Sequence, residues 1–393
     1  MTKSNKILIF STAYYPFVGG AEVAIREITD RLPNIEFDLI TAKMNKGLPF
    51  RERIGNVTVY RLGIGVPLVD KLIVALEGWV FARHLEKKNK YDAYWCMMAS
   101  FASGSAFISN IFSGIISKKK TPIILTLQEG DSEKYLEARR FGLVNLSWRL
   151  ALARTDTLTV ISNYLGERAK RLGFKGQVEL VPNGVNVNKF TKEISKEEKI
   201  QIRKDLGLGD SDMALVTTSR LNVKNGVGDV IKALTHLPDH FKFVVCGVGE
   251  LENELKKLAK DINVGDRVIW KGLVSHDDLP KYLKSCDIFI RPSLSEGMGN
   301  SFIEAMAAGI PVIATPVGGI TDFLTDDPSK VDIQTGYFCE PQKPESIVAT
   351  TMRIISDPNK SRVLENAKQL VTEKYNWDQI AVQMKAVFDR MTQ

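Results

Sequence analysis

Short apolar runs alternate with helix-like segments along the whole chain, and this alternation limits the fold more than any other feature of the sequence. In the first half the apolar runs span 6–10, 37–41, 57–62, 93–97, 123–127, 157–161 and 178–181. In the second half they span 213–219, 241–246, 268–270, 287–290 and 311–315. Strands that alternate with helices build parallel sheets covered by helices. The sequence therefore predicts an α/β protein with two Rossmann-like, doubly wound parallel-sheet domains that face a cleft.

A chain of 393 residues is too long for one ordinary core, so two domains are expected. The turn Pro182-Asn183-Gly184 separates the two alternating halves and is interpreted as the start of a linker. We expect an N-terminal domain over residues 1–187, a C-terminal domain over 188–376 and a last helix over 377–393. This last helix is amphipathic through Ile380, Met384, Val387 and Phe388.

Composition and residue spacing indicate a cytoplasmic globular protein without a metal. The chain is 44% hydrophobic and 25% charged, and no apolar run approaches the length of a membrane span. The four cysteines are scattered, which suits the reduced thiols of a cytosolic protein. The four histidines include no helix-spaced pair with a glutamate, so no metal site is predicted. No cofactor is expected either.

The net charge of +7 is unevenly divided. Residues 1–190 carry 27 Lys and Arg against 17 Asp and Glu, whereas residues 191–393 carry 26 against 29. Two apolar helical segments of the first half, 68–90 and 105–120, end in lysine clusters. Such helices can lie on an anionic membrane, so one interpretation is peripheral contact with its inner face. In the other, the apolar stripes pack on the sheet and the lysines stabilise the helix C-termini.

A glycine loop leads into a helix in the second half of the chain. Gly297 and Gly299 make the loop flexible, Asn300 or Ser301 is expected to cap the helix, and Gly309 is expected to end it. Unpaired amides at a helix start, together with the positive end of the helix dipole, form a site for an anion, most often phosphate.

Two carboxylates, Glu296 and Glu304, flank this loop. Eight residues apart, they would lie about 12 Å apart along a continuous helix, so they suit two ends of an extended ligand rather than a shared proton. The pattern Ser301-x-x-Glu304 also matches a capping box, in which Glu304 only accepts from a backbone amide. From the spacing alone, both interpretations stay open.

Basic and glycine residues follow other strands of the second half and are expected at the same sheet edge. They are Arg220, Lys224, Gly247 and Lys271. A guanidinium and an ammonium beside a helix start suit a diphosphate, and a carboxylate suits the vicinal hydroxyls of a ribose. The inferred ligand is a nucleoside diphosphate that carries a group recognised by Glu296.

Two strand ends of the first half also carry candidate binding groups. Gly19-Gly20 follows the first strand and allows the backbone to approach a ligand closely. Gln128-Glu129 follows the run 123–127, and polar groups at the carboxyl ends of parallel strands are where such sheets bind ligands.

The spacing Glu296-(seven residues)-Glu304, with Gly297-x-Gly299 inside it, resembles the signature of glycosyltransferase family 4. Four further motifs occur in that family's order: Gly19-Gly20-Ala-Glu22, Val181-Pro-Asn183-Gly184-Val185, Ser219-Arg220-Leu221 and Pro316-Val-Gly318-Gly319. The resemblance covers nearly the whole chain. It implies a retaining, metal-independent enzyme of the two-domain GT-B architecture, whose last helix crosses back to the first domain.

The resemblance also implies roles for individual residues. Arg220 would stabilise the diphosphate leaving group, Glu296 would contact the donor sugar and Glu304 the ribose. The first domain would bind the acceptor and the second the nucleotide sugar. The catalytic candidates are Arg220, Lys224, Glu296 and Gln128. The substrate-binding candidates are Gly19, Gly20, Asn225, Gly247, Leu273, Val274, Gly297, Met298, Gly299, Asn300, Ser301 and Glu304.

Two positions depart from the family pattern. The family usually has a lysine where this chain has Asn225, so either the preceding Lys224 reaches the phosphate or Asn225 supplies a neutral donor. The family often has His-Asp or His-Glu where this chain has Gln128-Glu129. Gln128 can form hydrogen bonds there, but it cannot act as a base.

We therefore expect transfer of a hexosyl group from a UDP- or GDP-linked sugar to a lipid-linked acceptor or a glycan precursor at the membrane surface. One alternative is a two-domain sugar-nucleotide epimerase or phosphorylase, although few histidines are available for proton transfer. Another is a non-catalytic protein that binds anionic lipid or nucleotide. No signature of a nucleic-acid-binding fold is found, so nucleic acid is not expected as a partner.

Overall fold

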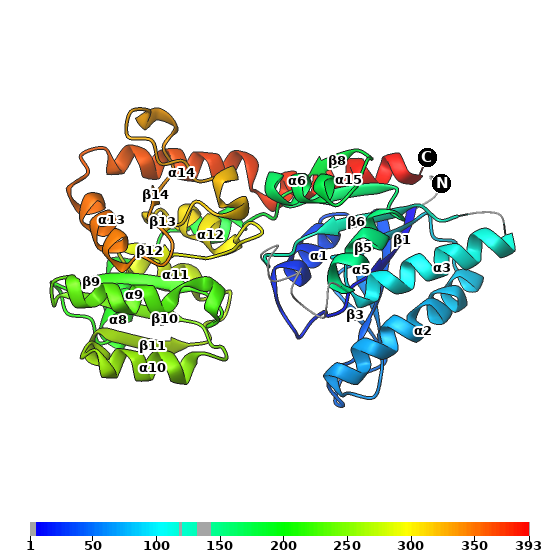
Figure 1. Ribbon diagram of the computed structural model, residues 1–393, viewed down its shortest axis with the longest axis horizontal. Coiled ribbons are helices and arrows are strands. Elements are labelled where there is room, and N and C mark those ends of the chain that lie inside the picture. The colour runs from blue at the N-terminus through cyan, green and yellow to red at the C-terminus, as the bar shows by residue number, and fades with distance from the viewer. Residues whose placement is uncertain (1–4, 118–119, 132–142, 393) are drawn as a thin grey trace. The chain divides into compact units, whose positions relative to one another are not determined.

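The computed structural model describes residues 5–117, 120–131 and 143–392. The chain divides into two compact units, one of residues 1–183 with 377–393 and one of residues 184–376 (Figure 1). The chain enters the second unit after Asn183 rather than after residue 187. The reason is that Val185 already pairs with the second unit, where its amide donates to the Tyr375 carbonyl at 2.7 Å.

The first unit is built on an eight-stranded sheet in the order β3-β4-β2-β1-β5-β6-β7-β8. Neighbouring strands are parallel except β3 and β4, which form an antiparallel hairpin. The inner strands are apolar at nearly every position because helices cover both faces of a parallel sheet. The strands are β1 (Asn5–Phe10), β2 (Ile35–Ala42), β3 (Arg51–Ile54), β4 (Val57–Leu62), β5 (Ala93–Met97), β6 (Ile123–Leu127), β7 (Thr157–Val160) and β8 (Val178–Leu180).

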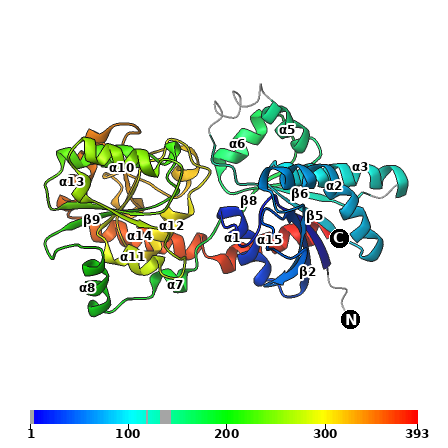
Figure 2. The same cartoon turned by 90° about the horizontal axis from the view of Figure 1, so that it is seen from below.

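The helices of the first unit include the last one of the chain. They are α1 (Gly20–Asp30), α2 (Pro67–Lys88), α3 (Phe101–Ser117), α5 (Leu143–Leu152), α6 (Asn163–Arg171) and α15 (Trp377–Thr392). Helix α15 packs beside α1 and β5 (Figure 2). Its Trp377 and Phe388 belong to the same buried core as Trp95, whose ring lies edge-on to Phe388 at 5.2 Å. The core of the first unit is therefore completed by the end of the chain.

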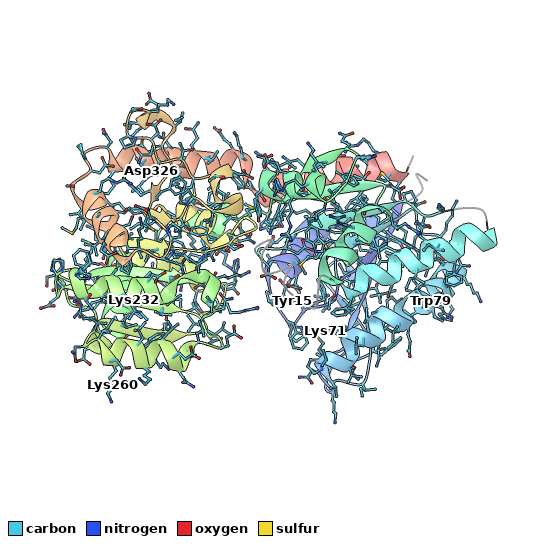
Figure 3. The ribbon with its side chains drawn as sticks, in the orientation of Figure 1. Tyr15, Lys71, Trp79, Lys232, Lys260 and Asp326 are labelled. Carbon is cyan, nitrogen blue, oxygen red and sulfur yellow. The ribbon has the colours of Figure 1, made fainter. Side chains whose placement is uncertain are left out.

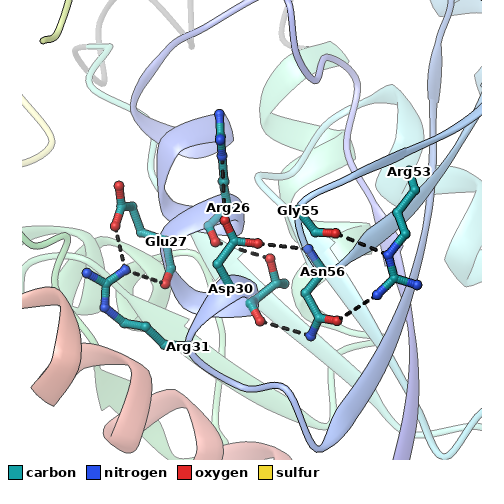
Figure 4. Close-up of polar contacts among 8 residues, drawn as sticks. Arg26, Glu27, Asp30, Arg31, Arg53, Gly55 and Asn56 are labelled. Atoms are coloured by element: carbon teal, nitrogen blue, oxygen red, sulfur yellow. Dashed lines mark hydrogen bonds and ion pairs between the residues drawn. The ribbon is translucent and has the colours of Figure 1, made fainter.

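A polar network joins the end of α1 to the turn between β3 and β4 (Figure 4). The side-chain amide of Asn56 donates to three carbonyls, those of Thr29, Leu32 and Ile35, at 3.1, 3.1 and 3.2 Å. The backbone N–H of Asn56 donates to the Asp30 carboxylate at 2.8 Å. These bonds fix α1, which begins at the Gly19-Gly20 motif.

The second unit holds a six-stranded, all-parallel sheet in the order β11-β10-β9-β12-β13-β14. The connections run outward in opposite directions from β9 and β12, so a switch point lies between these two strands. Ligands of such sheets bind at the carboxyl ends of the strands at this point. The strands are β9 (Met213–Thr218), β10 (Phe241–Cys246), β11 (Val268–Gly272), β12 (Ile288–Arg291), β13 (Val312–Ala314) and β14 (Tyr337–Phe338).

The helices of the second unit cover its sheet and are shorter on average. They are α7 (Val187–Thr191), α8 (Lys196–Asp205), α9 (Val227–Ala233), α10 (Glu252–Asp261), α11 (Leu279–Ser285), α12 (Asn300–Ala308), α13 (Pro344–Ser356) and α14 (Lys360–Lys374). A separate core, centred on Phe241, Phe243 and Tyr337, supports this unit. Within the described part of the chain, no helix combines the length and the hydropathy that crossing a membrane requires.

Candidate active site

The loop between β12 and α12 forms one side of the switch point. Helix α12 begins at Asn300, and its N-cap is Gly299, in a left-handed conformation with φ 90° and ψ 80°. The expectation that Asn300 or Ser301 caps the helix is therefore wrong, and the Ser301–Glu304 capping box does not form. A glycine takes the cap because only glycine adopts this backbone conformation readily. At the other end Gly309 terminates the helix, as predicted.

Glu296 is held by a buried arginine that the sequence analysis did not single out. Nη2 of Arg291 lies 2.6 Å from Oε2 of Glu296, and Nη1 donates to the Ser301 hydroxyl at 2.9 Å. The guanidinium stacks over the Phe302 ring at 4.3 Å. Burial lowers the pKa of Arg291, while the Glu296 and Glu304 carboxylates oppose that shift. Arg291 thus fixes both the Glu296 carboxylate and the first turn of α12.

Glu304 lies on α12 with 9% of its surface exposed. Its Oε1 lies 3.0 Å from Nε2 of His276, on the loop after β11. The same loop carries Leu273 and Val274, both predicted to bind substrate, and Leu273 is 81% exposed. His276 is therefore a further residue of the site that the sequence analysis missed, because 28 positions separate it from Glu304.

The loop after β9 forms the other side of the switch point. Arg220 is exposed, and Asn225 is buried with its side-chain amide donating to the Arg220 carbonyl at 2.6 Å. The carbonyl of Lys224 accepts from the Leu294 amide at 2.7 Å, which joins this loop to the one after β12. Since the Asn225 side-chain amide is already bonded within the loop, the neighbouring Lys224 is the better candidate for binding a negatively charged group of a ligand.

Glycines allow four loops to meet at this sheet edge. A Cβ on Gly226 would lie 2.1 Å from the Pro292 carbonyl oxygen, and one on Gly247 would lie 1.9 Å from that of Ser219. A Cβ on Gly318 would lie 1.8 Å from the Glu296 carbonyl oxygen. Any side chain at these positions would force the loops apart. Gly247, predicted to bind substrate, thus has a packing reason for being glycine.

Several buried polar atoms at the same edge have no hydrogen-bond partner within the part of the chain that the structure describes. They are the hydroxyls of Thr217, Thr218, Ser219 and Ser293 and the Oδ1 of Asn222. Leaving a buried polar group unpaired costs about 1–3 kcal/mol, so this edge of the sheet carries a local cost in stability. By contrast Met298 is 1% exposed, so only its backbone can face a ligand.

In the first unit the predicted residues are tied to their neighbours. The Gly19 amide donates to the Glu22 carboxylate at 2.8 Å, so this amide is occupied and Gly20 opens α1. Gln128 and Asn183 exchange two hydrogen bonds between their side-chain amides, both at 3.2 Å. Gln128 therefore holds the last residue of the unit before the chain crosses to the second unit.

The Glu129 carboxylate holds the backbone of Gln128 by a hydrogen bond. This carboxylate accepts from the backbone amides of Ala99 at 2.7 Å and Gln128 at 2.9 Å, which joins the loops after β5 and β6. Burial raises the pKa of Glu129 to about 7, although the backbone hydrogen bonds favour the charged form. From the sequence Glu129 is a candidate binding group, and in the structure its carboxylate holds two backbone amides.

Two doubly wound sheets, the second with paired carboxylates around a glycine-capped helix start, define a glycosyltransferase of the GT-B type. Residues 198–381 match the family model described as glycosyl transferases group 1, and residues 18–189 match that of Glycosyltransferase Family 4. The chain belongs to glycosyltransferase family 4. The predicted fold class and family are thereby confirmed.

Curated relatives agree over different lengths. An uncharacterised glycosyltransferase of Methanocaldococcus jannaschii is 26% identical, covering 98% of this chain and 97% of the relative. A Bacillus subtilis glycosyltransferase named for teichuronic acid biosynthesis is 31% identical over 67% of each chain. A GDP-mannose-dependent phosphatidylinositol monomannoside mannosyltransferase of Mycobacterium tuberculosis is 28% identical over 58% of this chain and 60% of the relative.

Solved structures share the fold at low identity. Sucrose-phosphate synthase from Thermosynechococcus elongatus superposes with a TM-score of 0.84 at 20% identity, covering 98% of this chain and 99% of the other. The HepE protein of Anabaena, solved with UDP-glucose, has a TM-score of 0.76 at 18% identity over 98% and 99%. These likenesses establish the fold and leave the donor to be argued from the site.

Proposed function

We propose that this glycosyltransferase moves a hexosyl group from a UDP- or GDP-linked sugar to its acceptor with retention of configuration. The observation that carries the proposal is the arrangement around α12. Glu296 and Glu304 flank the start of α12. The loop that bears Arg220 and Lys224 is hydrogen-bonded to the loop that precedes α12. A diphosphate over the helix start would place its nucleoside and its sugar at the two carboxylates.

The residues then divide the chemistry between them. Amides at Gly297–Asn300 would hold the diphosphate, while Arg220 and Lys224 would stabilise the charge that grows on it as the sugar bond breaks. Glu304 would accept hydrogen bonds from the ribose hydroxyls and Glu296 from those of the sugar. Because Gln128 cannot accept a proton, the proton of the attacking hydroxyl would pass to the departing phosphate oxygen on the same face of the sugar.

The relatives support both candidate donors. The mycobacterial mannosyltransferase is named for GDP-mannose, whereas the Anabaena structure holds UDP-glucose. The mycobacterial enzyme is also named for a phosphatidylinositol acceptor, which favours a lipid-linked acceptor for this chain.

A surface of the first unit supports action at a membrane. Helix α2 buries one face, through Val74, Ala82 and Leu85, yet its opposite face is also apolar. Exposed apolar side chains recur at every fourth position of this face, at Leu68, Leu72, Leu76 and Val80. We name these four residues the α2 stripe. The loop before the helix adds Ile64 and Val66 to the exposed apolar surface.

The charge around the α2 stripe matches an anionic bilayer. Residues 43–90 carry ten lysines and arginines against four acidic residues. Of those acids, Asp70 is buried and accepts from three backbone amides, while Glu52 pairs with Arg61 and Glu86 with Arg83. Figure 3 labels Lys71 and Trp79 on this helix. We infer that the enzyme works as a peripheral protein on the cytoplasmic face of the membrane.

The second lysine-flanked segment, helix α3, exposes less apolar surface for membrane contact than α2 does. Helix α3 packs against α2, with the rings of Trp79 and Phe112 stacked at 4.7 Å, and it exposes only Ile111 and Phe112 to more than a third among its described side chains. Lys118 and Lys119 of the predicted cluster lie outside the described residues. The membrane proposal therefore rests on α2.

The proposed reaction is tested with Glu304→Ala and Arg220→Ala in a transfer assay. Removing a preorganised electrostatic group typically lowers turnover about 100-fold or more, and this is the expected loss for each variant. Glu254→Ala on α10 and Arg362→Ala on α14, both exposed, are the matched controls and should retain activity. Normal turnover in both site variants would contradict the proposal. Thermal shifts with UDP and GDP identify the base, since a ligand at 100 times its Kd stabilises by about 2.7 kcal/mol.

A further inference from the structure

His276 lies between a lysine and the carboxylate assigned to the ribose. Its Nε2 is 3.0 Å from Oε1 of Glu304, and its Nδ1 is 3.4 Å from Nζ of Lys189. Lys189 comes from α7, at the start of the second unit, and also forms an ion pair with Asp277. Three side chains from α7, the β11–α11 loop and α12 thus form one continuous chain of polar contacts.

The two neighbours of His276 determine which ring nitrogen carries the proton. An ammonium group can only donate, so Nδ1 accepts from Lys189, and the proton of a neutral ring then resides on Nε2. An N–H at Nε2 points at Oε1 of Glu304, which as a carboxylate can only accept. His276 is therefore a donor to Glu304 in this arrangement.

Packing supports one face of the imidazole, whose side chain is 46% exposed. The ring of Phe190, which is fully buried on α7, lies edge-on to His276 with 5.5 Å between centroids. Helix α7 in turn packs on α12, the helix that bears Glu304. A ring held by packing on one face and by hydrogen-bonding groups at both nitrogens restricts the rotamer of the carboxylate to which it donates.

We propose that His276 is a positioning residue that orients Glu304 for the vicinal hydroxyls of the nucleotide ribose, with Lys189 fixing its tautomer. With Oε1 engaged by the imidazole, the other carboxylate oxygen and the remaining lone pairs face the ligand in a single orientation. This inference rests on the proposed function, because it requires that Glu304 accept from the ribose.

The test compares ribose with deoxyribose in the ligand. Binding of UDP and dUDP, and of GDP and dGDP, is measured by titration calorimetry on the whole protein for wild type, His276→Ala, His276→Gln and Glu304→Ala. Wild type should prefer the ribonucleotide of the base that it binds. His276→Ala should lose about tenfold in affinity for that ribonucleotide, the factor typical of one charge-assisted hydrogen bond, while its affinity for the deoxynucleotide stays unchanged. His276→Gln keeps an N–H donor and should restore most of the preference.

The outcomes separate this inference from the function on which it rests. Equal losses for ribo- and deoxynucleotide in His276→Ala would indicate a structural role and overturn the inference. The inference would also be overturned if His276→Ala kept the wild-type preference for the ribonucleotide while Glu304→Ala lost that preference. A full preference in Glu304→Ala would instead refute the assignment of Glu304 to the ribose. His240→Ala, which removes an exposed histidine packed on Phe241, is the matched control and should leave every affinity unchanged.

Discussion

At the scale of single residues, Arg291 is the most deeply buried cation of the candidate site. Arg291 is 7% exposed, and its guanidinium donates to Glu296 and Ser301 at once. Arg291→Met would leave Glu296 without its cation, and breaking a buried pair in this way costs about 3–5 kcal/mol. We expect a lower free energy of unfolding in urea and a loss of turnover well beyond that of the control Arg362→Met.

Arg291→Lys refines the same prediction. A lysine retains the charge but lacks the planar fork that reaches two acceptors, so turnover should recover only in part. Wild-type turnover in Arg291→Met, measured on folded protein, would show that Glu296 needs no orientation.

Glu129 should make the stability of the first unit depend on pH. Its pKa is about 7 in the folded protein against an ordinary value of 4.5, so folding takes up a proton between these two values. The contribution of Glu129 to stability is therefore complete below about pH 4.5 and is lost as the pH rises through 7. Glu129→Gln should make the melting temperature less dependent on pH between 4.5 and 7 than it is in the control Glu254→Gln. The same slope in both variants would contradict the raised pKa.

At the scale of elements, the strands were far more predictable than the side-chain contacts. Each apolar run of the sequence is a strand in the structure, and the inner strands give the strongest signal because they are buried on both sheet faces. The edge strands β3 and β14 were not predicted. Strand β3 alternates exposed and partly buried residues of the polar sequence Arg-Glu-Arg-Ile, and β14 has only two residues. The partners Arg291 and His276 could not be predicted, because nothing in their local sequence states what they face after folding.

Helix α2 carries the prediction that belongs to this scale. The apolar α2 stripe should insert into an anionic bilayer, so the double variant Leu72→Glu and Leu76→Glu should lose most of its binding to vesicles of phosphatidylglycerol and phosphatidylcholine. Sedimentation with these vesicles at low salt is the measurement. Val382→Glu on α15 is the control, because Val382 is 67% exposed, similar to Leu76 at 71%.

Two results would contradict the membrane assignment. One is wild-type vesicle binding by the double variant. The other is a wild-type protein that ignores the vesicles but forms a dimer, seen by light scattering, that the double variant abolishes. In that case a second copy covers the α2 stripe.

At the scale of the whole molecule, the chain builds one unit, then the other, and ends in the first. Trp377 lies at the start of α15 and is 2% exposed in the core of the first unit, although it follows directly on the second unit in sequence. Each unit has a core of its own, and domains with separate cores often unfold in separate steps. Stability effects should therefore follow the unit and not the order of the sequence.

This expectation can be tested by calorimetry with two tryptophan variants. Trp377→Ala should lower the unfolding transition of the first unit, since removing a buried tryptophan costs about 3–5 kcal/mol. Trp270→Ala, which removes a partly buried ring packed on the core of the second unit, should lower the other transition. UDP or GDP should raise only the transition that Trp270→Ala lowers, because the residues assigned to the nucleotide all lie in the second unit. If the nucleotide raises the transition that Trp377→Ala lowers, the nucleotide has been assigned to the wrong unit.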